Sequence, residues 1–173
     1  MSTLKNTSIT MTTSVISSKD NKFRYILKKE WNSKKKTALV ISLSAGKANE
    51  VFCDYTTTFI INALNELDYG SVTIMNVFAH ISEKYTTDDE NLKQIQENIN
   101  MEEIDSIIIA WGRGCETASK KVKEEIFKIE KILDEVSDKC MVIADKKGLR
   151  GLHPLKAQNE WCLVPWKKAQ KKK

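Results

Sequence analysis

The chain has 173 residues, of which 41% are hydrophobic and 29% are charged, with a formal net charge of +5. This length and balance are typical of a soluble globular protein with one domain large enough to bury a core. No stretch approaches about 18 uninterrupted apolar residues, so we expect no membrane span. The N-terminal segment lacks the apolar run and cleavage pattern of a signal peptide, so we expect a cytoplasmic protein.

The cysteines and the excess lysines narrow the choice of cofactors and partners. The four cysteines are scattered, without a C-x-x-C pair or histidines at ligand spacing, which argues against a metal site or a disulfide framework. We therefore predict no metal and no cofactor. Lysine runs at 34–36 and in the C-terminal tail permit a polyanionic partner such as nucleic acid, without establishing one.

In chain order, the sequence divides into a Ser- and Thr-rich flexible leader (1–20), one domain (21–166) and a basic tail (167–173). Apolar runs and alternation predict strands within 22–31, 37–44, 71–78, 105–111, 139–144 and 160–166. Amphipathic spacing predicts helices after Asp54, around 88–100 and over 115–137. Buried strands that alternate with helices predict an α/β fold, a three-layer α/β/α sandwich with a mainly parallel four-stranded central sheet.

Ligands of open parallel sheets bind beyond the carboxyl ends of the strands. Both histidines, two of the three arginines and most glycines fall at such positions. We therefore predict that these segments enclose one small polar pocket. Its candidate ligand-binding residues are Ser42, Ser44, Thr56, Asn76, Phe78, Trp111, Gly112, Arg113, Arg150 and His153.

Several candidates also have a structural interpretation. Asp54 is a natural helix N-cap whatever else it does. Trp111 either packs in the core or lines the pocket, and its place at a strand end beside Gly112 favours the pocket. The stretch "GRGCET" at 112–117 follows the third buried strand and is not G-x-G-x-x-G, so we reject a dinucleotide-binding fingerprint.

Two further residues carry possible chemistry. Cys115, close to a helix start, is either a thiol of lowered pKa or a structural thiol, and we favour the second. His153 lies in the loop "GLRGLHPL" at 148–155, which combines an imidazole, a cation and a proline. A histidine there is suited to donate to a carbonyl or phosphate oxygen, which makes His153 a candidate catalytic residue together with Asp54.

The order of these motifs resembles the bacterial and phage family DUF1643. The family pattern runs L-N-P-S, D-P-T, N-L-F-A, A-W-G and H-P-L. The corresponding segments here are 41–44, 54–56, 76–79, 110–112 and 153–155, with Ser42 in place of the family's Asn and Tyr55 in place of its Pro. The segments 110–112 and 153–155 are also similar to elements of uracil-DNA glycosylases. That resemblance implies a glycosylase-like fold with a pocket that approaches a base.

Three functions follow as hypotheses. The first is a nucleotide- or nucleobase-binding protein, of a phage type that sequesters its ligand. The second is a DNA glycosylase or other N-glycoside hydrolase, in which His153 stabilises the leaving base while Asp54 or Asn76 positions water. The third is a nucleic-acid-binding module that uses the lysine-rich surface. We favour the first because the pocket residues include no obvious general base.

Overall fold

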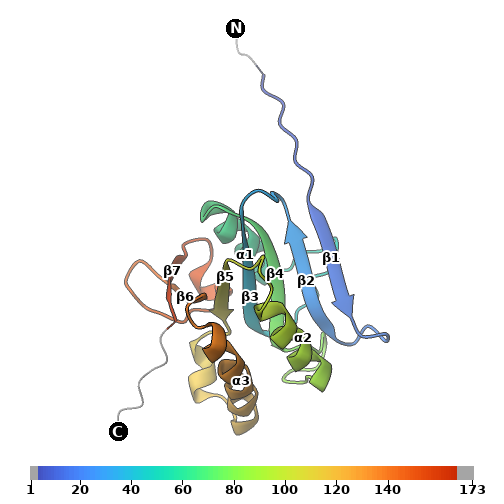
Figure 1. Cartoon of the computed structure of the whole chain (residues 1–173), viewed down its shortest axis with the longest axis vertical. Coiled ribbons are helices and arrows are strands. Elements are labelled where there is room, and N and C mark those ends of the chain that lie inside the picture. Colours follow the sequence, from blue (N-terminus) through green and yellow to red (C-terminus); the bar gives the residue numbers. More distant parts are fainter. Residues whose placement is uncertain (1–3, 167–173) are drawn as a thin grey trace.

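A seven-stranded sheet runs through residues 4–166, the part of the chain that the computed structural model describes (Figure 1). The strand order is β1-β2-β4-β3-β5-β6-β7. Their bounds are β1 Thr12–Ser17, β2 Arg24–Glu30, β3 Lys36–Ser44, β4 Tyr69–Phe78, β5 Ser106–Ala110, β6 Cys140–Ala144 and β7 Cys162–Pro165. The inner strands β4, β3, β5 and β6 are parallel, while β1, β2 and β7 run antiparallel to their neighbours.

The sheet is therefore larger than the four-stranded one predicted from the sequence. The four parallel strands are present, but three antiparallel strands extend them at the two edges. The added strand β1 lies within the segment predicted as a flexible leader. Its side chains alternate between exposed and half-buried, and Val15 packs against the core, so pairing with β2 gives this Ser- and Thr-rich segment a defined place.

Helices cover both faces of the sheet, so the mixed α/β architecture has the expected layers. One face packs against α1 (Tyr55–Glu66) and the short α4 (Pro154–Ala157), and the other against α2 (Asp89–Ile99) and α3 (Lys120–Leu133). Two short 3-10 turns, Arg113–Thr117 and Asp134–Val136, flank α3. None of the helices within residues 4–166 is long and apolar enough to cross a membrane.

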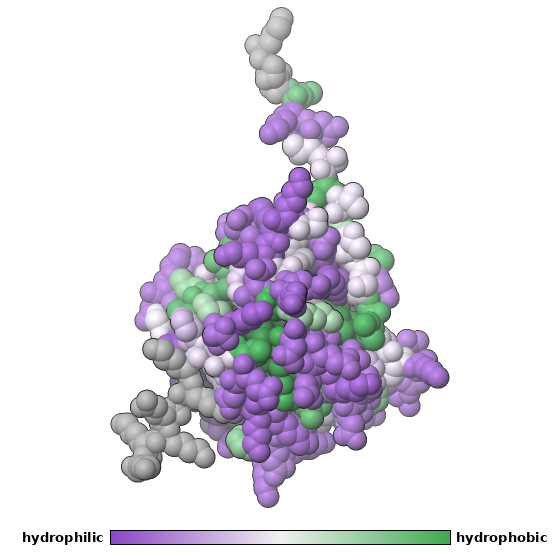
Figure 2. Space-filling view, in the orientation of Figure 1, coloured by the Kyte–Doolittle hydropathy of each residue, from purple (hydrophilic) through white to green (hydrophobic). Residues whose placement is uncertain are grey.

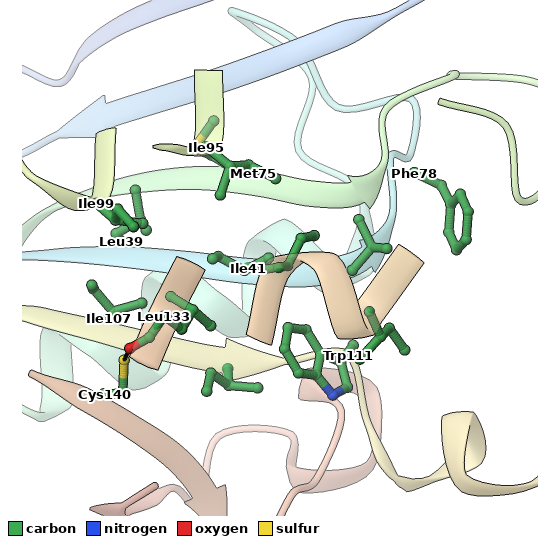
Figure 3. Packing of buried hydrophobic residues seen from close by; sticks show 14 of the residues in the cluster. Leu39, Ile41, Met75, Phe78, Ile95, Ile99, Ile107, Trp111, Leu133 and Cys140 are labelled. Carbon is green, nitrogen blue, oxygen red and sulfur yellow. Dashed lines mark hydrogen bonds between the residues drawn. The ribbon is translucent and has the colours of Figure 1, made fainter. Parts of the chain in front are cut away.

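The central position of β3 in the sheet explains why its sequence is a continuous apolar run. Leu39 and Ile41 point into the core shared with α2 and α3 (Figure 3). Ala38 and Val40 point into the core shared with α1. All four side chains are fully buried. A central parallel strand covered on both faces needs apolar residues at every position.

Capping residues determine where α1 and α2 begin. The Asp54 carboxylate accepts a hydrogen bond from the backbone N–H of Thr57 at 2.9 Å and begins α1. The Asp88 carboxylate does the same for Asn91 at the start of α2. Helix α3 begins at Lys120, because the residues predicted as its first turn form the 3-10 turn that follows β5.

The strand order fixes where a cavity can form. The chain passes from β3 to its neighbour β4 on one side, and later to β5 on the other side of β3. In open α/β sheets, ligand sites usually form beside such a reversal of strand order, at the carboxyl ends of the strands.

Candidate functional site

The end of β5 places Trp111 between the sheet and α3. The residue is 9% exposed and belongs to the core on the α2 and α3 face, at the carboxyl-terminal tip of the strand (Figure 3). Gly112 then takes a φ of +83° and a ψ of 164°, a backbone conformation that residues other than glycine rarely adopt. The chain turns there and enters the 3-10 segment that precedes α3.

Two loops that are distant in the sequence meet at this turn. A Cβ built on Gly112 would lie 2.8 Å from the Cβ of His153, so Gly112 lies directly against His153. A Cβ on Gly151 would lie 3.7 Å from the Cγ of Arg113. The loop after β5 and the loop after β6 are therefore packed directly against each other.

A cavity of about 1080 Å³ lies beside this junction, and we call it the Trp111 cavity. The segments around it are the end of β5, the following 3-10 turn, α3, β6, residues 150–151 and Trp166. Ile109 and Val142 give it an apolar floor, and three aromatic side chains line it: Trp111, Phe127 and Trp166. This volume slightly exceeds the usual range for small-molecule sites, about 300–1,000 Å³.

The Trp111 cavity also carries charge. Its four cationic residues outnumber its three acidic ones: Arg113, Lys120, Lys123 and Arg150 against Glu116, Glu124 and Glu130. The Arg113 Nε lies 3.6 Å from Glu116 Oε1 in an exposed ion pair, and the Arg150 guanidinium donates to the carbonyl of Pro165. Because these pairs are exposed, they are weak and can exchange for an anionic ligand.

Trp111 has a hydrogen-bond donor to offer. Among the described residues, no group accepts a hydrogen bond from its indole N–H. That N–H is also not sealed away from solvent, in contrast to the indole N–H of Trp31. A ligand with a carbonyl or phosphate oxygen can therefore bind this donor.

His153 lies next to the cavity, although it does not line it. It is the N-cap of α4, and its Nδ1 accepts a hydrogen bond from the backbone N–H of Leu155 at 3.2 Å. This bond assigns the proton of the neutral imidazole to Nε2. Burial lowers the pKa of His153 below its ordinary value, which favours that neutral form.

A second group, the Arg24 cluster, lies at the carboxyl ends of β3 and β4. Arg24 is 3% exposed and donates to the carbonyl of Ala48 at 2.7 Å and to Asn76 Oδ1 at 3.0 Å. Burial lowers the pKa of this guanidinium, and the charge of Asp54 partly counteracts that effect. Asn76 in turn accepts from Asn91 Nδ2 at its own carbonyl, at 2.9 Å. Asn76 is therefore committed to a buried network and does not face the Trp111 cavity.

Asp54 and Ser42 border the same cluster. The Asp54 carboxylate caps α1, and its Oδ2 would lie 2.1 Å from a Cβ built on Gly46, so a side chain at position 46 would displace this oxygen. Ser42 is 2% exposed and pairs with Asn76 and with Ala110 in neighbouring strands, and no described residue hydrogen-bonds to its buried hydroxyl. Neither residue lines the Trp111 cavity.

The remaining sequence candidates lie elsewhere on the rim. Ser44 is exposed, and Thr56 is half-buried in the first turn of α1. Phe78 is fully buried, with its ring edge-on to Tyr85 at a centroid distance of 5.4 Å. The Cys115 thiol donates to the Gly112 carbonyl at 2.7 Å, and burial raises its pKa, which fits a structural thiol.

The structure thus places the ten ligand-binding candidates in different parts of the molecule. Trp111, Gly112, Arg113 and Arg150 come together at the Trp111 cavity, with His153 in contact at its edge. The others belong to the Arg24 cluster, the α1 start or the core, except Ser44, which is exposed at the end of β3. Arg24 was not among the candidates, although its rarity was a signal: it is one of three arginines in the chain.

These features define an α/β protein with an aromatic and cationic cavity at the carboxyl ends of its parallel strands. A family model described as "Protein of unknown function (DUF1643)" matches residues 24–155, and the chain belongs to this family. The matched range contains every sequence candidate for the site. Comparisons with curated proteins and with solved structures gave no significant match.

Proposed function

We propose that the protein binds a nucleotide or nucleobase in the Trp111 cavity. The observation that carries the proposal is the meeting of an indole donor with Arg113 and Arg150, which come from two different loops. Trp111 and Trp166 offer aromatic surface to a base, and the arginines offer planar donors to a phosphate. The contact between Gly112 and His153 holds these two loops together.

The fold is compatible with the glycosylase-like pocket that the sequence resemblance implies. Four parallel strands lie between helices, and the segments 110–112 and 153–155 lie side by side at their carboxyl ends. Because Asp54 and Asn76 are engaged in the cap of α1 and in the buried Arg24 cluster, binding is better supported than hydrolysis. Sequestration of a ligand is the simplest role for such a site.

Isothermal titration calorimetry with uridine, uridine 5′-monophosphate and adenosine 5′-monophosphate tests the proposal. We expect binding of at least one nucleotide. Arg150→Gln and Arg113→Gln should weaken nucleotide binding about tenfold each, as expected for loss of a charge-assisted bond. The same changes should affect uridine less, because it lacks the phosphate.

Lys93→Gln serves as the matched control. Lys93 lies on α2, outside the cavity lining, and its removal changes the net charge by the same amount. It should leave the affinity unchanged. Absence of heat with all three compounds in a folded sample, or equal losses in Lys93→Gln and Arg150→Gln, would contradict the proposal.

A hydrolytic function is the second candidate, and the position of His153 favours it. The Cβ and backbone of His153 lie against Gly112, and no described residue accepts a hydrogen bond from its Nε2 proton. Such a donor is suited to stabilise a leaving base. Incubation with duplexes that contain uracil or modified bases, followed by an abasic-site assay, tests this. Cleavage that disappears in His153→Ala would support hydrolysis, and no cleavage on any duplex would leave binding alone.

The lysine-tail hypothesis concerns residues 167–173, which lie outside the described residues. It remains a prediction that removal of this tail weakens a salt-dependent, sequence-independent binding to DNA.

A further inference from the structure

The edge strand β1 leaves one row of backbone groups without a partner. It pairs with β2 on one side, and no described strand lies on its other side. Exposed edges in soluble proteins usually carry lysine or proline, which prevents pairing with other chains. Residues 6–18, "NTSITMTTSVISS", contain no charged residue, no proline and no glycine.

Residues 4–11 continue from β1 as an extended arm that projects beyond the sheet (Figure 1). All of their side chains are exposed, including Leu4 at 98%, Ile9 at 72% and Met11 at 46% (Figure 2). Their backbone groups make no hydrogen bonds to other described residues. The arm and the outer edge of β1 therefore form one continuous segment. Its backbone groups on that side have no hydrogen-bond partner among the described residues.

The side-chain pattern of the arm continues that of β1. Thr13 and Val15 point to the sheet face that carries α1, where Val15 packs and Thr13 accepts from Lys29. Because side chains alternate along a strand, a continuation places Met11 and Ile9 on this same face. The arm thus carries two apolar side chains, Ile9 and Met11, that the described residues leave exposed.

We propose that this segment pairs, antiparallel, with the same segment of a second copy, around a twofold axis at Met11. Asn6–Thr10 of each copy then lie opposite Thr12–Ile16 of the other, so the arm of one copy covers the open edge of its partner. The paired stretch of 11 residues is about 37 Å long. It joins the two sheets edge to edge and places Ile9 and Val15 of both copies on one face.

A second copy is the occupant that the chemistry favours. Antiparallel pairing of identical strands is isologous, so it closes at two copies and satisfies both open edges at once. The absence of charge on both partners removes the repulsion that would oppose such pairing.

The pairing places Met11 opposite Met11, which gives a specific test. Analytical ultracentrifugation of the full chain should show a dimer. Met11→Lys and Met11→Glu should each be monomeric, because each puts like charges directly opposite. An equimolar mixture of the two variants should recover the dimer, since lysine then faces glutamate.

Leu4→Lys is the control, because residue 4 lies outside the paired stretch, and it should remain dimeric. Removal of residues 1–11 should give a folded monomer with the same circular dichroism spectrum. A wild-type chain that is monomeric at every concentration would overturn the proposal. A dimer that persists in Met11→Lys, or a mixture that stays monomeric, would overturn it as well. None of these variants touches the Trp111 cavity, so the result is independent of ligand binding.

Discussion

Gly112 packs directly against His153, with 2.8 Å between a Cβ built on the first and the Cβ of the second. They come from loops 41 positions apart in the chain, and their contact brings the β5 end and the histidine loop together. Gly112 has no room for a side chain, and its φ of +83° independently disfavours one.

Gly112→Ala should therefore destabilise the protein by about 1–3 kcal/mol, from backbone strain alone or with displacement of His153. Urea denaturation measures the change. Gly114→Ala is the matched control, because a Cβ at Gly114 meets nothing within 4 Å and its φ is not positive. Equal stability of the two variants would show that the contact is not maintained in solution.

Arg24→Ala should lower the free energy of unfolding by about 3–5 kcal/mol, since it leaves Asn76 Oδ1 and the Ala48 carbonyl without their donor in a buried site. Arg113→Ala, which removes an exposed pair with Glu116, should change the free energy of unfolding by no more than about 0.5 kcal/mol. Chemical denaturation of both variants compares the two arginines. A small effect of Arg24→Ala would mean that the cluster is hydrated.

Stability should fall on the acid side because of His153. Burial lowers its folded-state pKa below the unfolded value of 6.5, so the unfolded chain binds a proton first as the pH falls. The stability contributed by the neutral imidazole is complete above pH 6.5 and is lost as the pH falls from there through the lowered folded-state pKa. NMR titration of the imidazole gives the pKa directly. His153→Gln should reduce the pH dependence of unfolding in this range, and an unchanged profile would contradict the assignment.

The four thiols should differ in reactivity. Cys162 is exposed, whereas burial raises the pKa of Cys140 to about 12 and also raises that of Cys115. A disulfide reagent at neutral pH should therefore modify Cys162 first, and Cys140 only after unfolding. Mass spectrometry of digested peptides measures the order, and Cys162→Ser should remove the fast phase. Rapid labelling of Cys140 in the native protein would contradict its burial.

The layered α/β arrangement and the four parallel strands could be predicted because their sequence signals are local. The run 37–44 is apolar at every position, and α3 has apolar residues at four of its core-facing positions, Val122, Ile126, Ile129 and Leu133. The full width of the sheet could not be predicted from such local signals. Strand β1 has few apolar residues, and its place depends on pairing with β2 and not on its own composition.

The candidate site was predictable only as far as the strand ends. The sequence indicated that Trp111 and His153 lie at the same edge, and the contact at Gly112 places them there. It could not indicate which face of the sheet each strand position takes, because both faces of the inner strands are buried. Asn76 and Ser42 therefore proved to be buried near Arg24, whereas Trp111 faces α3.

Strand β3 supplies side chains to the apolar layers on both faces of the sheet, with Leu39 and Ile41 on one side and Ala38 and Val40 on the other. Neither layer can melt while the other persists, because loss of this strand removes contacts from both. The domain should consequently unfold in a single cooperative transition that different spectroscopic probes report at the same midpoint.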